Sequence, residues 1–113
     1  MAEEYTVSEE ELILDQMLVA FGAGVGFMRV SRQTVGAFRK THEGIAREII
    51  SEGAWAEDGV HLLEHVRAVG RLAANLAVNR GDVGVTEGDL NGAFDNVSRT
   101  SRTRWCRSSE LAQ

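Results

Sequence analysis

Two histidines on one predicted helix have the spacing best suited to chemistry in this chain of 113 residues. His61 and His65 lie four residues apart with Glu64 between them, so both imidazoles would share one helix face and hold a zinc ion. A catalytic zinc needs a third protein ligand, and His42 is the only other histidine. The leucines between the two histidines are equally well explained by an amphipathic helix. We therefore expect neither a metal nor another cofactor.

Three alternate glycines, Gly22, Gly24 and Gly26, form the second such pattern. A glycine loop that binds a nucleotide follows a strand, and no strand is predicted before residue 22. Gly22 and Gly26 instead form a small-xxx-small pair suited to close helix packing. Each glycine costs a helix about 1 kcal/mol relative to alanine. Either the helix ends in this run, or close packing against another backbone offsets the cost.

Polar and basic side chains gather at the start of the second predicted helix and again near the end of the chain. The segment 30–40 resembles the start of the recognition helix in helix-turn-helix regulators, which implies that residues 31–34 face the major groove of DNA. The alternative is a serine-capped amphipathic helix with a solvated basic face. The candidate nucleic-acid residues are Ser31, Arg32, Gln33, Thr34, Arg39, Lys40, Arg102, Arg104 and Arg107.

The net charge is −5, and the two signs are segregated along the chain. Residues 1–28 contain six acidic residues and no basic one, whereas residues 29–48 and 99–107 are basic. An acidic chain is a poor non-specific binder of nucleic acid, although the two basic segments keep that function open. The single cysteine, Cys106, excludes an internal disulfide and any zinc site built from several cysteines.

Length and composition predict one soluble domain. The acidic start is unlike a signal or transit peptide, and the apolar run 17–28 is too short to span a bilayer, so we expect a cytoplasmic protein without a membrane span. The absence of proline suits long helices. No internal repeat or linker is evident.

Hydrophobic periodicity predicts four helices. The first begins at Ser8, the second runs from 31 or 33 to 51, the third from 57 to 79, and the fourth begins at Thr86. Trp55 falls in the connector before the third helix. Gly81 is the expected C-terminal cap of that helix, and Thr86 with Asp89 forms a capping box.

The segment 57–97 resembles the last two helices of the histone fold and, equally, the helical lid of AAA+ ATPases. The resemblance rests on a long alanine-rich helix, an extended piece at Val83 and Val85, and a short helix capped by Thr86. In histone folds that extended piece pairs with the matching loop of a partner chain. No Walker motif is present, so we expect no ATP hydrolysis and no enzymatic activity.

These patterns together predict an all-α, four-helix, bundle-like single domain over residues 1–113, with 1–7 and 99–113 as flexible tails. We expect a non-enzymatic assembly or scaffold protein that forms a homo-oligomer or a larger protein assembly and takes no small-molecule substrate. A small DNA-associated regulator is the alternative. The candidate interface residues are Phe21, Gly22, Gly26, Val66, Val69, Ala73, Leu76, Val83 and Val85.

Overall fold

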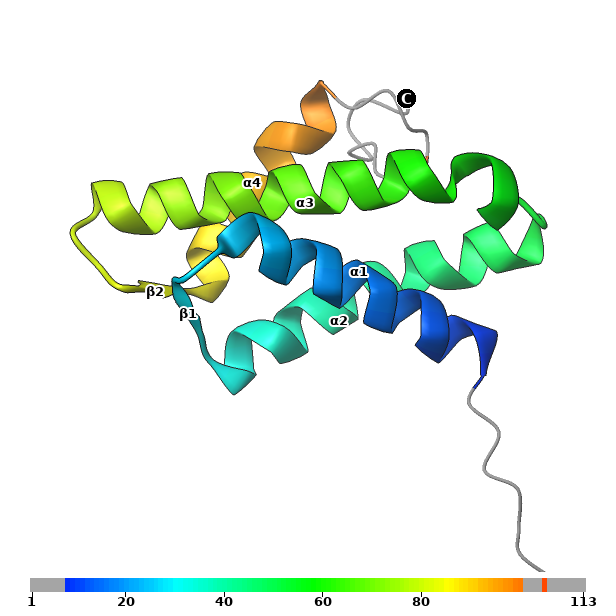
Figure 1. The fold of residues 1–113 in the computed structure, drawn as a ribbon, viewed down its shortest axis with the longest axis horizontal. Coiled ribbons are helices and arrows are strands. Elements are labelled where there is room, and N and C mark those ends of the chain that lie inside the picture. Colours follow the sequence, from blue (N-terminus) through cyan, green and yellow to red (C-terminus); the bar gives the residue numbers. More distant parts are fainter. Residues whose placement is uncertain (1–7, 101–104, 106–113) are drawn as a thin grey trace, which may run out of the picture.

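Four α-helices and two very short strands make up the part of the chain that the structure describes (Figure 1). The computed structural model describes residues 8–100 and Trp105. The elements in chain order are α1 (Glu9–Val25), β1 (Arg29–Val30), α2 (Arg32–Ser51), α3 (Trp55–Asn79), β2 (Gly84–Val85) and α4 (Glu87–Arg99). The all-α prediction is confirmed, and none of these four helices is long and apolar enough to cross a membrane.

The helix α1 continues through the glycine run and ends at its last member. The Ser8 hydroxyl caps its start by accepting the backbone N–H of Glu11 at 3.2 Å. Gly22 and Gly24 both lie inside the helix. Gly26 ends it with a φ of 71°, a left-handed conformation that favours glycine. The sequence left open whether the helix breaks here, and the structure places the break at the third glycine.

Gly24 and Gly70 let α1 and α3 touch backbone to backbone. A Cβ atom on Gly24 would lie 2.1 Å from the carbonyl oxygen of Arg67, and one on Gly70 would lie 2.3 Å from that of Phe21. Real Cβ atoms do not approach backbone so closely, so only glycine fits at either position. Close backbone packing offsets the glycine cost at Gly24, whereas an added Cβ atom at Gly22 or Gly26, the pair predicted for such packing, would meet nothing within 4 Å. The helix that packs so closely on α3 is α1 of the same chain.

The strands β1 and β2 form a parallel bridge between two loops that are far apart in the sequence. Arg29 lies opposite Gly84, and Val30 lies opposite Val85. The Arg29 N–H also donates to the Val83 carbonyl at 3.0 Å. The extended piece at Val83–Val85 was predicted, but its pairing partner was not. Resemblance to histones placed that partner in a second chain, whereas β2 pairs with β1 of the same chain.

The helices α2 and α4 begin directly after the bridge, and their caps are equivalent. The Ser31 hydroxyl accepts the N–H of Thr34 at 3.1 Å, and the Thr86 hydroxyl accepts that of Asp89 at 3.3 Å. The Asp89 carboxylate accepts the Thr86 N–H in return, which confirms the predicted capping box. The Thr34 hydroxyl donates to the Val85 carbonyl at 3.1 Å and so ties the start of α2 to β2.

The helix α3 begins two residues earlier than predicted, at Trp55. Trp55 is therefore part of the first turn instead of the connector. Its indole lies over Gly59, where a Cβ atom would be 3.0 Å from the ring. The indole of Trp105 is buried beside the same turn and donates its Nε1–H to Asp58 at 2.8 Å. Gly81, with a φ of 79°, follows the end of the helix as expected.

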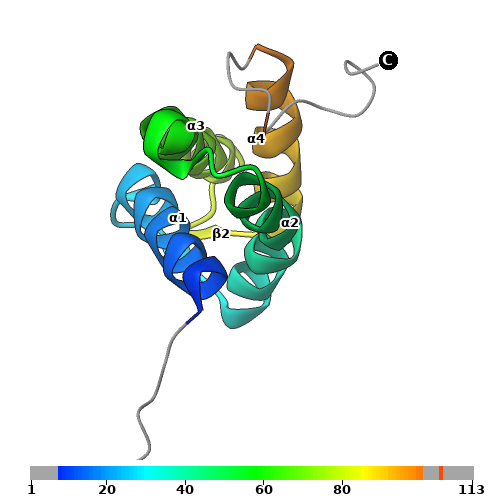
Figure 2. The same cartoon turned by 90° about the vertical axis from the view of Figure 1, so that its right-hand side faces the viewer.

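The four helices surround one apolar interior, as the end-on view shows (Figure 2). The rings of Phe21 and Phe38 meet there with centroids 4.9 Å apart, joining α1 to α2. The main buried apolar side chains are Leu14, Met17, Phe21, Phe38, Ile49, Leu62, Val66, Val69, Ala73, Val85, Leu90 and Ala93. Burial of these side chains leaves the opposite side of α1 facing solvent.

Candidate functional site

The side of α1 that faces away from the core is exposed and lacks charge over most of its length. Leu12 is 50% exposed and Val19 is 72% exposed, and the side chain of Phe27 is fully exposed directly after the helix. No charged residue occurs from residue 16 to residue 28. We define the outer face of α1 as Leu12, Gln16, Val19, Gly22, Ala23 and Gly26, together with Phe27.

The apolar residues of α1 are spread around the whole helix instead of forming one stripe. A surface helix normally concentrates its apolar residues on the side that faces the core, whereas a helix that is apolar all round is normally covered all round. Within the described residues, α2 and α3 cover only the inner side of α1. The composition of the helix therefore predicts a further surface that covers its outer face.

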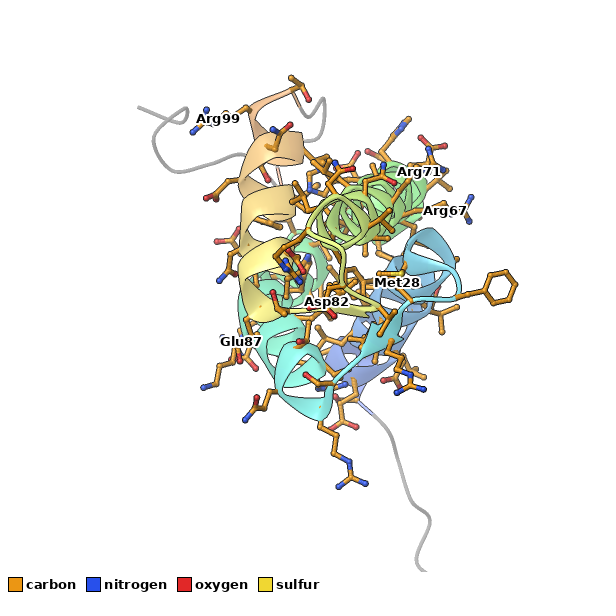
Figure 3. All side chains as sticks on the ribbon, turned by 90° about the vertical axis from the view of Figure 1, so that its left-hand side faces the viewer. Met28, Arg67, Arg71, Asp82, Glu87 and Arg99 are labelled. Carbon is orange, nitrogen blue, oxygen red and sulfur yellow. The ribbon has the colours of Figure 1, made fainter. Side chains whose placement is uncertain are left out.

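The two ends of this surface differ in charge. Arg67 and Arg71 project from α3 on the side away from α4 (Figure 3), and their backbone atoms are the nearest neighbours of Gly24 in α1. Glu9 and Glu11 lie in the first turn of α1. All four charged side chains belong to exposed residues, and none forms an ion pair with another described residue. The surface is thus acidic where α1 begins and basic where α1 ends.

An apolar pocket of about 380 Å³ opens beside the start of α1. It lies between the first turns of α1, the end of α2 and the start of α3. The residues that matter most for its chemistry are Leu12, Ile13, Ile49, Ile50 and Trp55, with Glu9 at its edge. Leu12 belongs both to this pocket and to the outer face of α1, so the two form one continuous surface.

The candidate interface residues from the sequence divide into two groups. Five of them are core side chains of this chain, namely Phe21, Val66, Val69, Ala73 and Val85. The other four are exposed, namely Gly22, Gly26, Leu76 and Val83. The candidate interface residues did not include Leu12, Val19 or Phe27, although the last two lie in the uncharged run from residue 16 to residue 28.

The candidate nucleic-acid residues in 31–40 are partly engaged within the chain. Ser31 caps α2, and Thr34 is buried and donates to β2. Arg39 lies 3.6 Å from the carboxylate of Asp15 in an ion pair. Arg32, Gln33 and Lys40 are exposed. The candidates Arg102, Arg104 and Arg107 lie outside the described residues, as does Cys106.

A second hollow, of about 630 Å³, lies where α2 and α4 begin. Arg29 and Gln33 line it, and so do Asp82 and Glu87. Arg80 forms ion pairs with Asp82 and with the buried carboxylate of Asp89, and it lowers the pKa of Asp82. Desolvation raises the pKa of Asp89, but the hydrogen bonds from Arg80 and Thr86 outweigh it, so that pKa is lowered too. Acidic groups that stay ionised therefore offset the basic groups at this end of the molecule.

A buried polar cluster lies where α2, α3 and α4 meet. The Nδ1–H of His42 donates to the Phe38 carbonyl at 2.8 Å, so Nε2 carries the free lone pair. The Nε2 atoms of His42 and His65 and the hydroxyl of Ser98 are buried without a hydrogen-bond partner among the described residues. The Phe94 ring meets both imidazoles edge-on. Desolvation lowers the pKa of each histidine to about 4, so both are neutral at pH 7.

The zinc pair considered from the sequence is divided between two environments. His65 points into the buried cluster, whereas His61 is exposed. Within residues 8–100 and Trp105, no three potential metal ligands of the histidine, cysteine or carboxylate type come together. A zinc ion on His61 and His65 would therefore lack a third such ligand in this part of the chain.

No protein family, curated protein or solved structure matches this chain. The resemblances of 57–97 to histone-fold and AAA+ lid helices, and of 30–40 to a recognition helix, therefore stay predictions. Any functional proposal has to rest on the surfaces described above.

Proposed function

We propose that this chain is a non-enzymatic helical assembly protein that acts through helix–helix contacts made by the outer face of α1. The observation that supports the proposal most is the exposure of Leu12, Val19 and Phe27 along the outer face of α1, which carries no charged residue after Asp15. Exposed large apolar side chains that form a continuous surface mark sites of protein contact. Burial of such side chains is the main favourable term in protein association.

The charge distribution of the helix supports the same function. The inner side of α1 already fills the core, so fold stability does not require valine or leucine on the outer side. Polar residues there would raise solubility, yet the exposed positions after Asp15 are glutamine, valine, glycine and alanine. Contact with another helix accounts for small and apolar residues at these positions, because they let two helices approach closely.

Light scattering across a wide range of protein concentration tests the proposal. We expect an oligomer that Val19→Glu converts to a monomer, because a carboxylate on the outer face would lose its hydration on association. Val78→Glu is the matched control, since Val78 is an exposed valine near the end of α3. Circular dichroism should show both variants folded. A monomer at every concentration, or equal behaviour of the two variants, would contradict the proposal.

Nucleic-acid binding is the second candidate function. It is favoured by the adjacent starts of α2 and α4, which direct backbone N–H groups toward one hollow beside Arg29. The engagement of Thr34 and Arg39, and the carboxylates of Asp82 and Glu87 at the same hollow, weigh against it.

A DNA mobility shift at two salt concentrations tests this second function. Salt-sensitive binding that Arg32→Ala with Gln33→Ala abolishes would support it, because phosphate contacts weaken as salt rises. Absence of a shift at low salt would remove it from consideration.

A further inference from the structure

The exposed large apolar residues of α1 are arranged almost symmetrically about Val19. Leu12 lies seven residues before it and Phe27 eight residues after it. With a rise of about 1.5 Å per residue, Leu12 and Gly26, the residue that ends α1 and precedes Phe27, lie roughly 10 Å to either side of Val19. If two copies of α1 pack antiparallel with Val19 at the centre, Leu12 of one copy lies level with Gly26 of the other, next to Phe27.

The chemistry at these two levels is complementary. Leu12 borders the apolar pocket of about 380 Å³, and Phe27 is a fully exposed aromatic side chain. A cavity of about 150 Å³ is enough to hold a benzene ring, so the pocket can take up a phenyl group. Each copy thus offers a pocket at one end of α1 and a side chain suited to it at the other end.

The charges favour the same orientation. The helices α1 and α3 start at the same end of the molecule, so the surface has an acidic end at Glu9 and Glu11 and a basic end at Arg67 and Arg71 (Figure 1). An antiparallel pair places the acidic end of each copy near the basic end of the other. A parallel pair would place like charges together, which opposes association.

We propose that a second copy of this chain covers the outer face of α1, with the two α1 helices antiparallel and Phe27 of each copy in the apolar pocket of the other. This inference rests on the proposed assembly function and adds its partner and geometry. Such a contact is isologous, because each copy contributes the same patch and the pair closes on itself. Two phenyl groups are buried in one interface, and aromatic side chains in pockets dominate the energy of association.

Cross-linking of single-cysteine variants tests the orientation. In a Cys106→Ser background, Leu12→Cys and Phe27→Cys are mixed and treated with a short bis-maleimide. We expect a cross-link between the two different variants and between two copies of Val19→Cys, but none between two copies of Leu12→Cys. Val78→Cys, at the far end of α3, is the control that should stay uncross-linked. A strong cross-link between two Leu12→Cys chains would overturn the antiparallel arrangement.

The role of Phe27 is tested by equilibrium sedimentation of Phe27→Ala. We expect the dissociation constant of the dimer to rise about a hundredfold or more, because two buried phenyl groups are lost at once. Val78→Ala should leave it unchanged. A dimer that Val19→Glu dissociates but that shows neither the cross-links nor the Phe27 effect would overturn the geometry while leaving the assembly function standing. A monomeric wild-type chain would overturn both.

Discussion

The inner and outer sides of α1 contain similar residues, but the inner side packs against α3 and the outer side faces solvent. Gly24 faces α3, where an added Cβ atom would lie 2.1 Å from a backbone oxygen. Gly22 faces outward, and an added Cβ atom there would meet nothing within 4 Å. Only Ala23 separates the two glycines in the sequence, yet the fold requires glycine at position 24 alone. Glycine therefore marks a close helix contact on the inner side of α1 and an uncovered surface on the outer side.

The helix α3 repeats this contrast with histidine. His65 is buried against the ring of Phe94, and His61, one turn earlier, is exposed. The spacing in the sequence suggested the same role as zinc ligand for both residues, whereas burial in the fold lowers the pKa of His65 to about 4. In both helices, residue type and spacing show which residues share a face. The neighbouring helices decide whether each residue on that face is buried or exposed.

The largest expected effect comes from filling the inner contact. Gly24→Ala should lower the free energy of unfolding by about 3 kcal/mol or more, because the methyl group clashes with backbone that cannot rotate away. Urea unfolding followed by circular dichroism measures the change. Gly36→Ala in α2 is the matched control, since a Cβ atom there meets open space. Equal stability of Gly24→Ala and the wild type would contradict the close α1–α3 contact.

The buried histidines should make the fold sensitive to mild acid. Their pKa is about 4 in the folded chain and 6.5 as the ordinary value, so between these pH values the unfolded chain binds protons that the folded chain does not. The free energy of unfolding is therefore unaffected by the two histidines well above pH 6.5, and it falls as the pH drops toward 4. From pH 7 to pH 5 the loss should be about 2 kcal/mol for each histidine.

His42→Leu provides the test of that pH dependence. Urea unfolding at pH 7 and pH 5 should give a difference about 2 kcal/mol smaller in this variant than in the wild type, because one of the two titrating groups is gone. The exposed His61→Gln is the control and should keep the full difference. Burial is the main cause of both lowered pKa values, and among the described ionisable side chains only His65 adds to the lowering at His42. An unchanged pH difference in His42→Leu would rule out the cluster as its source.

The smallest expected effect lies on the outer side. Gly22→Ala should raise the free energy of unfolding by about 1 kcal/mol or somewhat less, because alanine favours the helix and the methyl group has room. Chemical denaturation of the wild type and the variant at low protein concentration measures it apart from association. A loss of stability instead would mean that the outer side of α1 is closely packed even in the single chain.

Local chemistry made much of the fold predictable from the sequence. The caps at Ser8, Thr86 and Gly81 were found because capping depends on residues within one turn. The strand β1 was not found, because two residues have no periodic pattern and this strand exists only through its pairing with β2. The glycine run 22–26 predicted close packing against another backbone, yet nothing in its spacing could say that α3 of the same chain would supply that backbone.

The candidate site was less predictable for the same reason. Periodicity placed Phe21 on an apolar face, and the structure shows that this face is the core side of α1. The uncharged run contains both Val19 and Phe27, but the positions of α2 and α3 decide which of its residues face outward. The proposed contact surface consists of those apolar residues of α1 that the core does not use. It can be identified only after the core residues are known.

The chain consists of two helix–strand–helix halves, α1-β1-α2 and α3-β2-α4, which the parallel bridge joins. Val30 and Val85 are bridge partners, and each is followed by a hydroxyl residue that caps a helix and then by Gly-Ala-Phe, at 36–38 and at 92–94. Each half therefore has a strand edge and an apolar layer that the other half covers. The connector between α2 and α3, residues 52–54, joins these two complementary halves through a short turn whose backbone N–H groups all bond to the last turn of α2.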